Sequence, residues 1–140
     1  MMSGFLRPLI SRRTFDFTGI SNPSIVSAIA LRSVDVANAK SAELCVRVHA
    51  NTNPQTGNKV RVVAKPVSLT REEPNADFLA DEVGNVDIGT DGDYPPGTLL
   101  IDAFTKPFGG AIQLSVEGFK SAAIDDTLMV TISVDLVMRD

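Results

Sequence analysis

The stretch that decides the fold is residues 126–139, DTLMVTISVDLVMR, near the end of the chain. Its large apolar side chains recur at every second position: Leu128, Val130, Ile132, Val134, Leu136 and Met138. Successive side chains of a strand point to opposite faces, so this spacing predicts a strand with one apolar face. A helix would scatter the same residues around its circumference. A strand about 40 Å long, at about 3.3 Å per residue, requires paired neighbours and a second layer over its apolar face.

Other segments repeat this alternation. Residues 14–18, 43–49, 98–104 and 111–119 each alternate or carry a short apolar run, and each predicts a further strand. In residues 43–49, for example, the inward set is Leu44, Val46 and Val48.

The segment NTNPQTGN, residues 51–58, is a strong turn signal because Asn, Pro and Gly each favour chain reversal. The strand at residues 59–69 is therefore expected to form a hairpin with the strand before it. Pro66 cannot donate a ladder hydrogen bond, which predicts a sheet edge or a bulge at that position.

Two segments are ambiguous between helix and strand. Residues 25–36 fit one turn of helix, or a strand with a parity slip near Arg32 and Ser33; the Val-rich flanks favour the strand. Residues 70–83 are the plausible helical segment after the first third of the chain, because Thr70 and Glu73 have capping-box spacing.

Seven or eight short strands separated by turns predict an all-β antiparallel sandwich, jelly-roll or immunoglobulin-like, with a barrel as second choice. A chain of 140 residues fits one domain, which we place at residues 14–140. Gly4 and Pro8 interrupt residues 1–13, which we expect to form an extended N-terminal arm.

Composition narrows the class of protein. No window reaches the 18 or so apolar residues of a membrane helix, and the first ten residues do not fit a signal peptide. The single cysteine, Cys45, forbids an internal disulfide and indicates a reducing compartment. A net charge of −4 argues against direct contact with nucleic acid.

The charges are unevenly distributed along the chain. Residues 71–93 hold eight acids and one base, whereas the first thirteen residues hold three arginines and no acid. These segments could attract each other between copies of the chain, or both could be solvated loops.

No set of residues predicts catalysis. The sole histidine, His49, shares a strand face with Cys45, but residues four apart on a strand lie about 13 Å apart, too far for a Cys–His pair or a shared metal. The chain has no Gly-x-Ser-x-Gly motif and no phosphate-binding glycine loop. We therefore expect neither an enzyme nor a cofactor.

The acidic loop around Asp91-Gly92-Asp93 is the best candidate for a small ion. Asp87, Asp91 and Asp93 could offer oxygens to calcium, although an ordinary Asp-Gly turn is the favoured interpretation and the EF-hand spacing is missing. The sole tyrosine, Tyr94, lies beside two prolines and could stack on a sugar or anchor a partner.

These features predict a non-enzymatic structural protein that self-assembles or coats a larger assembly. Small β-sandwiches of this kind are common in viral particles, so we expect a virion component of a virus or phage: a coat, decoration or connector protein. We expect it to be a homo-oligomer that is assembled in the host cytoplasm. A purely cytoplasmic location is the alternative. The alternative function is a module that binds carbohydrate, with or without calcium, or a peptide. The expected interface is Phe5, Leu6, Arg7, Leu9, Ile10, Arg12 and Arg13.

Overall fold

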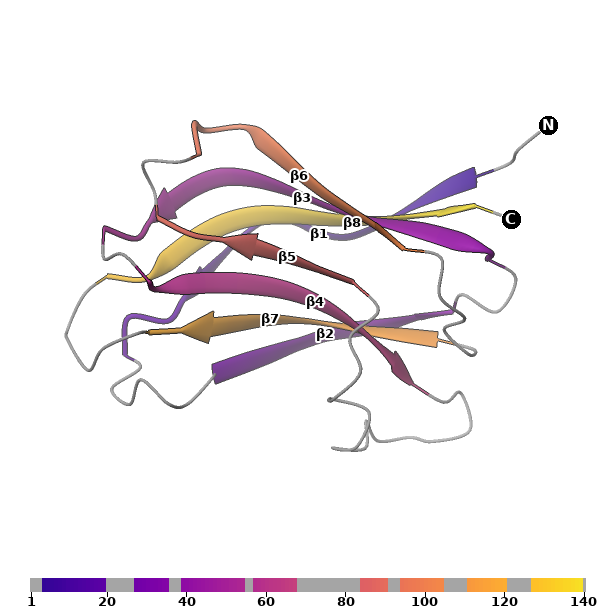
Figure 1. Ribbon diagram of the computed structural model, residues 1–140, viewed down its shortest axis with the longest axis horizontal. Coiled ribbons are helices and arrows are strands. Elements are labelled where there is room, and N and C mark those ends of the chain that lie inside the picture. The colour runs from indigo at the N-terminus through magenta and orange to yellow at the C-terminus, as the bar shows by residue number, and fades with distance from the viewer. Residues whose placement is uncertain are drawn as a thin grey trace.

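The computed structural model describes residues 4–19, 27–35, 39–54, 57–67, 84–90, 94–104, 111–120 and 127–139. This part of the chain contains strands and no helix, as the alternating pattern predicted (Figure 1). The eight strands are β1 (Gly4–Asp16), β2 (Ser27–Asp35), β3 (Ser41–Thr52), β4 (Lys59–Val67), β5 (Gly84–Ile88), β6 (Thr98–Phe104), β7 (Ala111–Phe119) and β8 (Met129–Arg139).

The strands form two antiparallel four-stranded sheets that pack face to face. The order is β1-β8-β3-β6 in the first sheet, which we call sheet A, and β2-β7-β4-β5 in the second, sheet B. Most connections cross from one sheet to the other, and the two orders together make the double Greek key of a jelly roll. The prediction of an antiparallel sandwich is confirmed, and of its two classes the jelly roll is the one observed.

Strand β8 is a central strand of sheet A, paired with β1 on one side and β3 on the other. Its burial alternates along its whole length, and its inward side chains are 0–1% exposed. Sheet B supplies the opposing layer, which includes Val60, Val62, Leu114 and Val116, all fully buried. Burying each such side chain stabilises the fold by about 1.5–3 kcal/mol.

The expected N-terminal arm is part of the sandwich instead. Residues Gly4 to Asp16 form β1, which pairs with β8 over its whole length, from Gly4 opposite Arg139 to Asp16 opposite Met129. The sequence hid this strand because its register slips twice, between Pro8 and Ile10 and between Ile10 and Arg13. Pro8 is tolerated because β1 is an edge strand.

The expected hairpin around residues 51–58 is wrong, because β3 belongs to sheet A and β4 to sheet B. The turn residues were read correctly, but turn chemistry does not say whether the returning strand pairs in the same sheet or crosses to the opposite one. In this crossing Asn53 and Asn58 are buried, and the Asn53 Nδ2 donates to the Asn58 carbonyl at 2.7 Å. The buried amide thus supports the turn between the layers.

One of the two ambiguous segments is resolved, and so is the expectation for Pro66. Residues 27–35 form a strand whose register shifts between Ala30 and Ser33, where a parity slip was predicted. Pro66 pairs with Ile112 of β7, but the pairing of β4 with β5 ends at Ala64, so Pro66 has the locally open side that its missing N–H requires. The candidate helix at residues 70–83 lies outside the described residues.

Gly118 allows one aromatic side chain to pack across the end of β7. A Cβ atom at this position would lie 2.2 Å from Cγ of Phe17, a distance that real Cβ contacts do not show. Phe17 is 3% exposed and joins the end of β1 to the core. The glycine is therefore required by the close approach of Phe17.

We expect Gly118→Ala to lower the free energy of unfolding by about 1–3 kcal/mol, because the added methyl group must displace a packed ring. Urea unfolding followed by circular dichroism measures this change. The matched control is Gly89→Ala, where a Cβ meets no atom within 4 Å and the expected change is within about 0.5 kcal/mol. Equal stability of the two variants would contradict the packing described.

Candidate interaction surface on sheet A

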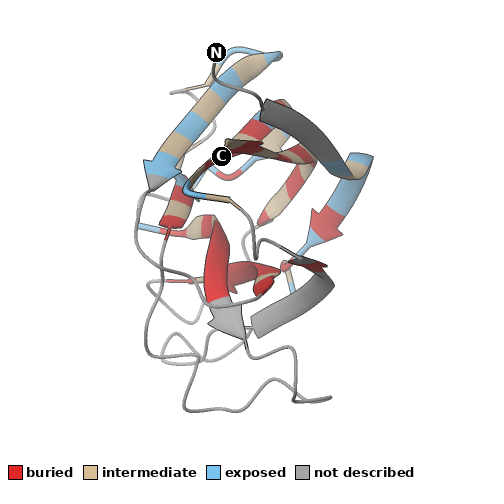
Figure 2. Ribbon diagram, turned by 90° about the vertical axis from the view of Figure 1, so that its right-hand side faces the viewer, coloured by how far each residue is buried: buried red, intermediate tan, exposed pale blue. Residues whose placement is uncertain are grey.

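The outer faces of the two sheets differ in their exposure. On sheet B the outward residues Val63, Lys65, Ser115 and Glu117 are only 0–9% exposed. On sheet A the residues between the buried ones are intermediate or exposed on every strand whose side chains are described (Figure 2). Beside these buried residues, Lys59, Arg61 and Asp87 of sheet B keep 26–50% of their side-chain surface exposed. Sheet A is thus the face whose described outward residues are all accessible.

Strand β6 carries the exposed large apolar residues of this surface. Leu99 is 44% exposed and Ile101 is 53% exposed, and both lie on the free edge strand of sheet A. Ala103, the next residue on the same face, is exposed as well. A row of apolar side chains on an edge strand is the kind of surface that proteins normally cover or break with charges.

Charges divide the outer face of sheet A into two halves. Arg47 on β3 stands beside Leu99 of β6. Outward side chains that lie opposite each other on neighbouring strands form a row across the sheet. Asp135 on β8 lies in the row next to that of Arg47, together with Cys45 and Ile101. Two outward rows of a strand are about 6.6 Å apart. Near the middle of the face, the half that contains Arg47 is therefore basic and the half that contains Asp135 is acidic, while Asp16 and Arg139 carry the opposite charges at the two far ends.

The two charges nearest the middle of this face are not paired with each other. Within the described residues neither Arg47 nor Asp135 forms a salt bridge, and the Arg47 Nη1 donates to the Gly97 carbonyl at 2.7 Å. Glu43, beyond Asp135, pairs with Arg139 at 3.3 Å. At the end of the acidic half, Glu43 is thus paired with a base, whereas Asp135, which borders the basic half, is not.

The basic half is built by bulges on both sides of β8. The register of β1 slips before Arg13, and that of β3 slips at His49. Arg12 takes the left-handed conformation, with φ 50°, which is uncommon for a residue with a side chain. Its N–H donates to Ser133 Oγ at 3.0 Å, and its Nη2 lies 3.4 Å from His49 Nδ1.

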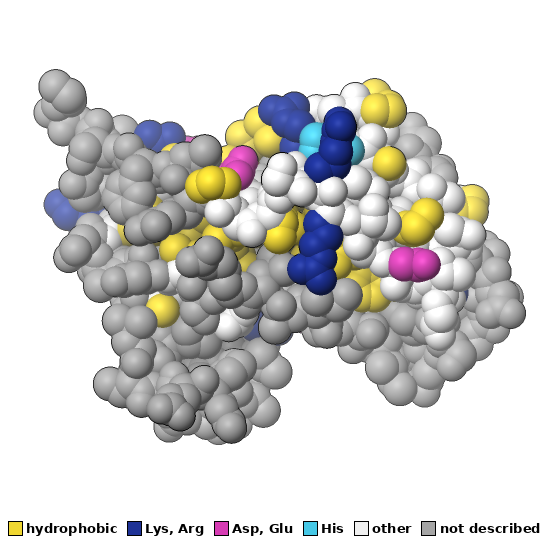
Figure 3. All heavy atoms as spheres, turned by 180° about the vertical axis from the view of Figure 1, so that it is seen from behind, with side chains coloured by type: hydrophobic (Ala, Val, Ile, Leu, Met, Phe, Trp, Pro, Cys, Tyr) yellow, Lys and Arg dark blue, Asp and Glu magenta, His cyan; other side chains and the backbone are white. Residues whose placement is uncertain are grey.

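The geometry around His49 differs from that of a catalytic Ser–His pair. Because a guanidinium only donates, Nδ1 of His49 is the acceptor, and the proton of the neutral ring is on Nε2. Nε2 therefore donates to Ser133 Oγ at 2.7 Å. A general base needs the reverse polarity, with Nε2 free to accept the serine proton. The cluster instead fixes Arg12 over the sheet, and Figure 3 shows Lys and Arg side chains gathered around the single histidine.

Cys45 lies on the same outer face but takes no part in this cluster. Burial raises the pKa of its thiol above the ordinary value, and the neighbouring carboxylates of Glu43 and Asp135 raise it further. Its Sγ lies 3.9 Å from the carbonyl of Glu43. The thiol form therefore dominates at neutral pH, which leaves Cys45 a weak nucleophile.

The residues expected to form the interface have mixed positions. Leu9 and Ile10 are partly buried against the core of their own chain, so they are not free to cover a neighbour as an arm would. Arg12 and Arg13 are exposed, and the Arg13 guanidinium lies 4.8 Å from the ring centre of Phe15. The remaining expected residues lie in β1, and their side chains are outside the described set: Phe5, Leu6 and Arg7.

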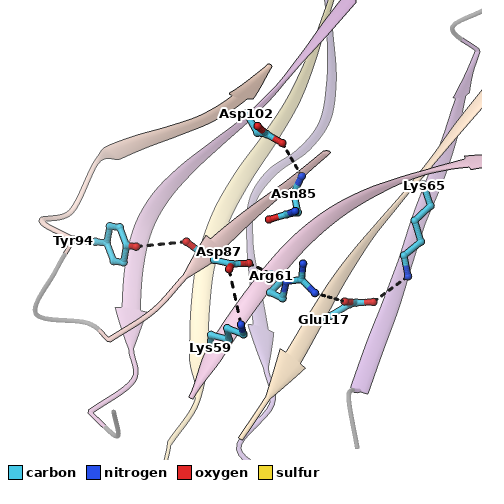
Figure 4. Close-up of polar contacts among 8 residues, drawn as sticks. All are labelled: Lys59, Arg61, Lys65, Asn85, Asp87, Tyr94, Asp102 and Glu117. Atoms are coloured by element: carbon cyan, nitrogen blue, oxygen red, sulfur yellow. Dashed lines mark hydrogen bonds and ion pairs between the residues drawn. The ribbon is translucent and has the colours of Figure 1, made fainter. Parts of the chain in front are cut away.

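The proposed ligand residues only partly come together. The Asp87 carboxylate lies 2.8 Å from Arg61 Nε and 3.9 Å from Lys59 Nζ, so cations already balance its charge (Figure 4). The Tyr94 hydroxyl donates to the Asp87 carbonyl at 3.4 Å, and the Tyr94 ring is partly buried against the core. Asp91 and Asp93 lie outside the described residues. Among those that are described, no three His, Cys, Asp or Glu residues are placed to hold a metal.

The charges on sheet B continue as a ladder. Glu117 lies 3.8 Å from Arg61 and 3.3 Å from Lys65, and the side chains of Lys65 and Glu117 are 9% and 11% exposed. Figure 4 shows these residues side by side on neighbouring strands. The acids and bases on this face of sheet B therefore form ion pairs within the chain, whereas Arg47 and Asp135 on sheet A do not.

Sequence reasoning missed the two parts of this surface that depend on pairing. Residues 98–104 were recognised as a strand, but an apolar run alone does not show that Leu99 and Ile101 point outward. Ser133 lies between the apolar residues Ile132 and Val134, and nothing in the sequence joins it to Arg12. The register of sheet A brings these residues together.

No protein-family model matches the chain, and no curated protein matches it significantly. Among solved structures, the VP2 protein of infectious bursal disease virus, in its subviral particle, aligns with a TM-score of 0.55 at 13% identity over 99% of this chain and 32% of that chain. The T13 particle of the same virus gives a TM-score of 0.54 at 14% identity over 99% and 31%. An adhesin domain of Lys-gingipain from Porphyromonas gingivalis aligns more loosely, with a TM-score of 0.45 at 10% identity over 79% of this chain and 63% of that one.

The VP2 chains of infectious bursal disease virus thus share a similar fold with this jelly roll. The chain spans about a third of the length of the VP2 chains that it matches. In the part of the chain that the structure describes, no helix is long and apolar enough to cross a membrane.

The conformation of Arg12 predicts an unusual order of stabilities. We expect Arg12→Gly to be more stable than Arg12→Ala by about 1 kcal/mol, because only glycine adopts a positive φ without steric cost. Thermal or urea unfolding of the two variants measures the difference, which is insensitive to the guanidinium that both lack. Equal stability would mean that residue 12 does not hold the left-handed conformation.

The raised pKa of Cys45 predicts slow alkylation. At pH 8 we expect iodoacetamide to modify the folded chain at least about tenfold more slowly than the urea-unfolded chain, since a higher pKa leaves less thiolate and burial restricts access. The rate should rise further as the pH is raised above 8, because a larger fraction of the thiol is then ionised. Mass spectrometry of the modified fraction over time measures both rates, and equal rates would contradict the burial of the thiol.

Proposed function

We propose that this chain is a non-enzymatic structural subunit that acts through protein–protein contacts in a virus-like particle. The observation that carries the proposal is the accessible outer face of sheet A with its exposed edge residues Leu99 and Ile101. Water-exposed Leu and Ile on an edge strand favour association. The jelly-roll fold shared with a viral capsid protein supports the particle context.

The finer assignment rests on the same features. We propose a virion location, with the chain serving as a coat, decoration or connector protein of a virus or bacteriophage and self-associating as a homo-oligomer. The uncompensated charges on the outer face of sheet A support a protein partner. A face that carries Asp135 and Glu43 beside its arginines is less suited to a phosphate backbone than a wholly basic one. The proposed contact no longer uses residues 1–13 as a separate arm, because most of them belong to β1.

Replacing the exposed edge residues tests this function. We expect the wild-type chain to be oligomeric in light scattering, and the double variant Leu99→Ser/Ile101→Ser to associate at least about tenfold more weakly, because it loses apolar area that association would bury. The variant Leu99→Val/Ile101→Val keeps an apolar β-branched surface and serves as the matched control. Circular dichroism of each variant checks that the fold is kept.

A wild-type chain that stays monomeric up to millimolar concentration, alone and with the rest of its particle, would refute a structural role through this surface.

A further inference from the structure

The distribution of charge on sheet A points to a specific partner for its outer face. We propose that a second copy of this chain packs face to face on this surface, related by a two-fold axis that runs across the strands near Val46 and Val134. The inference rests on the proposed function and deepens it, because it names the contact surface and its symmetry.

Accessibility selects sheet A over sheet B. On sheet B the outward residues Val63, Lys65, Ser115 and Glu117 are buried, and the charged side chains of that face already pair with one another: Lys59, Arg61, Asp87, Lys65 and Glu117. On sheet A, Leu99 and Ile101 are about half exposed, and Arg47 and Asp135 form no salt bridge within the described residues. A contact with another copy therefore breaks fewer ion pairs within the chain if it forms on sheet A than if it forms on sheet B.

The direction of the two-fold axis follows from the charges. An axis along the strands would place the basic half of one copy on the basic half of the other. An axis across the strands reverses the strand direction, so the row containing Arg47 and Leu99 lies over the row containing Asp135 and Ile101 of the second copy. Each Arg47 then comes within reach of an Asp135 one strand away, about 4.8 Å to the side.

The same operation matches the apolar residues. Leu99 of one copy lies over Ile101 of the other, and the two-fold repeats this contact. Four strands about 4.8 Å apart and some nine residues long present about 600 Å² per copy, or about 1,200 Å² in total. This area is at the lower end of specific interfaces, so we expect a weak dimer in solution that is strengthened where many copies meet.

Self-complementarity favours a second copy over other occupants. A nucleic acid would be attracted by Arg12 and Arg47 but repelled by Asp135 on the same surface. A two-fold contact uses both signs, because each copy supplies the base for the other copy's acid. The partner that satisfies both charges with the residues of this chain is the chain itself.

Charge reversal tests the pairing. In Arg47→Glu the new carboxylate faces Asp135 of the second copy twice, and in Asp135→Arg the new guanidinium faces Arg47 twice. We expect each variant alone to dimerise at least about tenfold more weakly than the wild type, since like charges oppose each other at both symmetric positions. Analytical ultracentrifugation, with one variant carrying a fluorescent label, measures each dissociation constant.

Mixing the two variants gives the decisive result. In a mixed dimer, the carboxylate introduced by Arg47→Glu in one copy faces the guanidinium introduced by Asp135→Arg in the other. The second position of the mixed dimer keeps the native pair of Arg47 and Asp135, so both positions are again complementary. We expect the mixture to dimerise with an affinity within a few-fold of wild type.

A matched control separates the pairing from a general effect of charge. Lys40→Glu makes the same charge change as Arg47→Glu at an exposed residue outside the strands and should leave dimerisation unchanged. Thermal unfolding confirms that each variant is folded.

The other outcomes overturn the inference in distinguishable ways. If the wild type is oligomeric but neither reversal weakens it, or if mixing restores nothing, another surface such as the β6 edge joins the copies; the structural role would survive and the face-to-face dimer would not. If the wild type is monomeric and Arg47→Glu abolishes binding of a labelled single-stranded oligonucleotide, the face serves nucleic acid. A monomer that binds neither copy nor oligonucleotide removes both the dimer and the proposed self-association.

Discussion

The burial of one face of β8 is the constraint on which the rest of the structure depends. Its inward side chains are almost completely removed from water, and they can be covered only if β1 and β3 pair on either side and sheet B closes over them. The pairing of β1 with β8 takes up the first residues of the described chain, although they include a proline and two register slips. Strand β1, whose sequence alternates poorly, is thus held in place by pairing with β8, whose sequence alternates strictly.

The same constraint shapes the surface. Buried and accessible residues alternate along β8 without interruption, so the irregularities of pairing lie in its neighbours, as bulges in β1 and β3. Residues of both bulges contact the side chain of Ser133. Arg12 and His49 are brought together there although 37 residues separate them along the chain. Bulges commonly redirect side chains in this way. The basic half of the outer face is therefore a consequence of how the edge strand fits the central one.

The two outer faces make different uses of charge. On sheet B, acids and bases lie on neighbouring strands and pair within the chain, from Lys59 through Asp87, Arg61 and Glu117 to Lys65. On sheet A, Arg47 and Asp135 are diagonal neighbours that do not pair. A surface that keeps opposite charges apart, beside exposed Leu and Ile, is suited to a contact between molecules. The jelly roll, a fold similar to that of VP2 from infectious bursal disease virus, presents that surface on a broad sheet.

The sequence by itself determined most of the strands, and their inward faces wherever apolar residues alternate strictly, because a two-residue period reports burial directly. Residues such as Leu44, Val46 and Val48 could be assigned to the core before any strand was paired, and the slip in β2 was visible as a change of parity. The tertiary structure alone decided which strands share a sheet, that residues 4–13 are a strand, and that Leu99 and Ile101 face outward. The physical reason is that pairing and register depend on contacts between residues far apart in the chain, whereas periodicity and turn chemistry describe only neighbours.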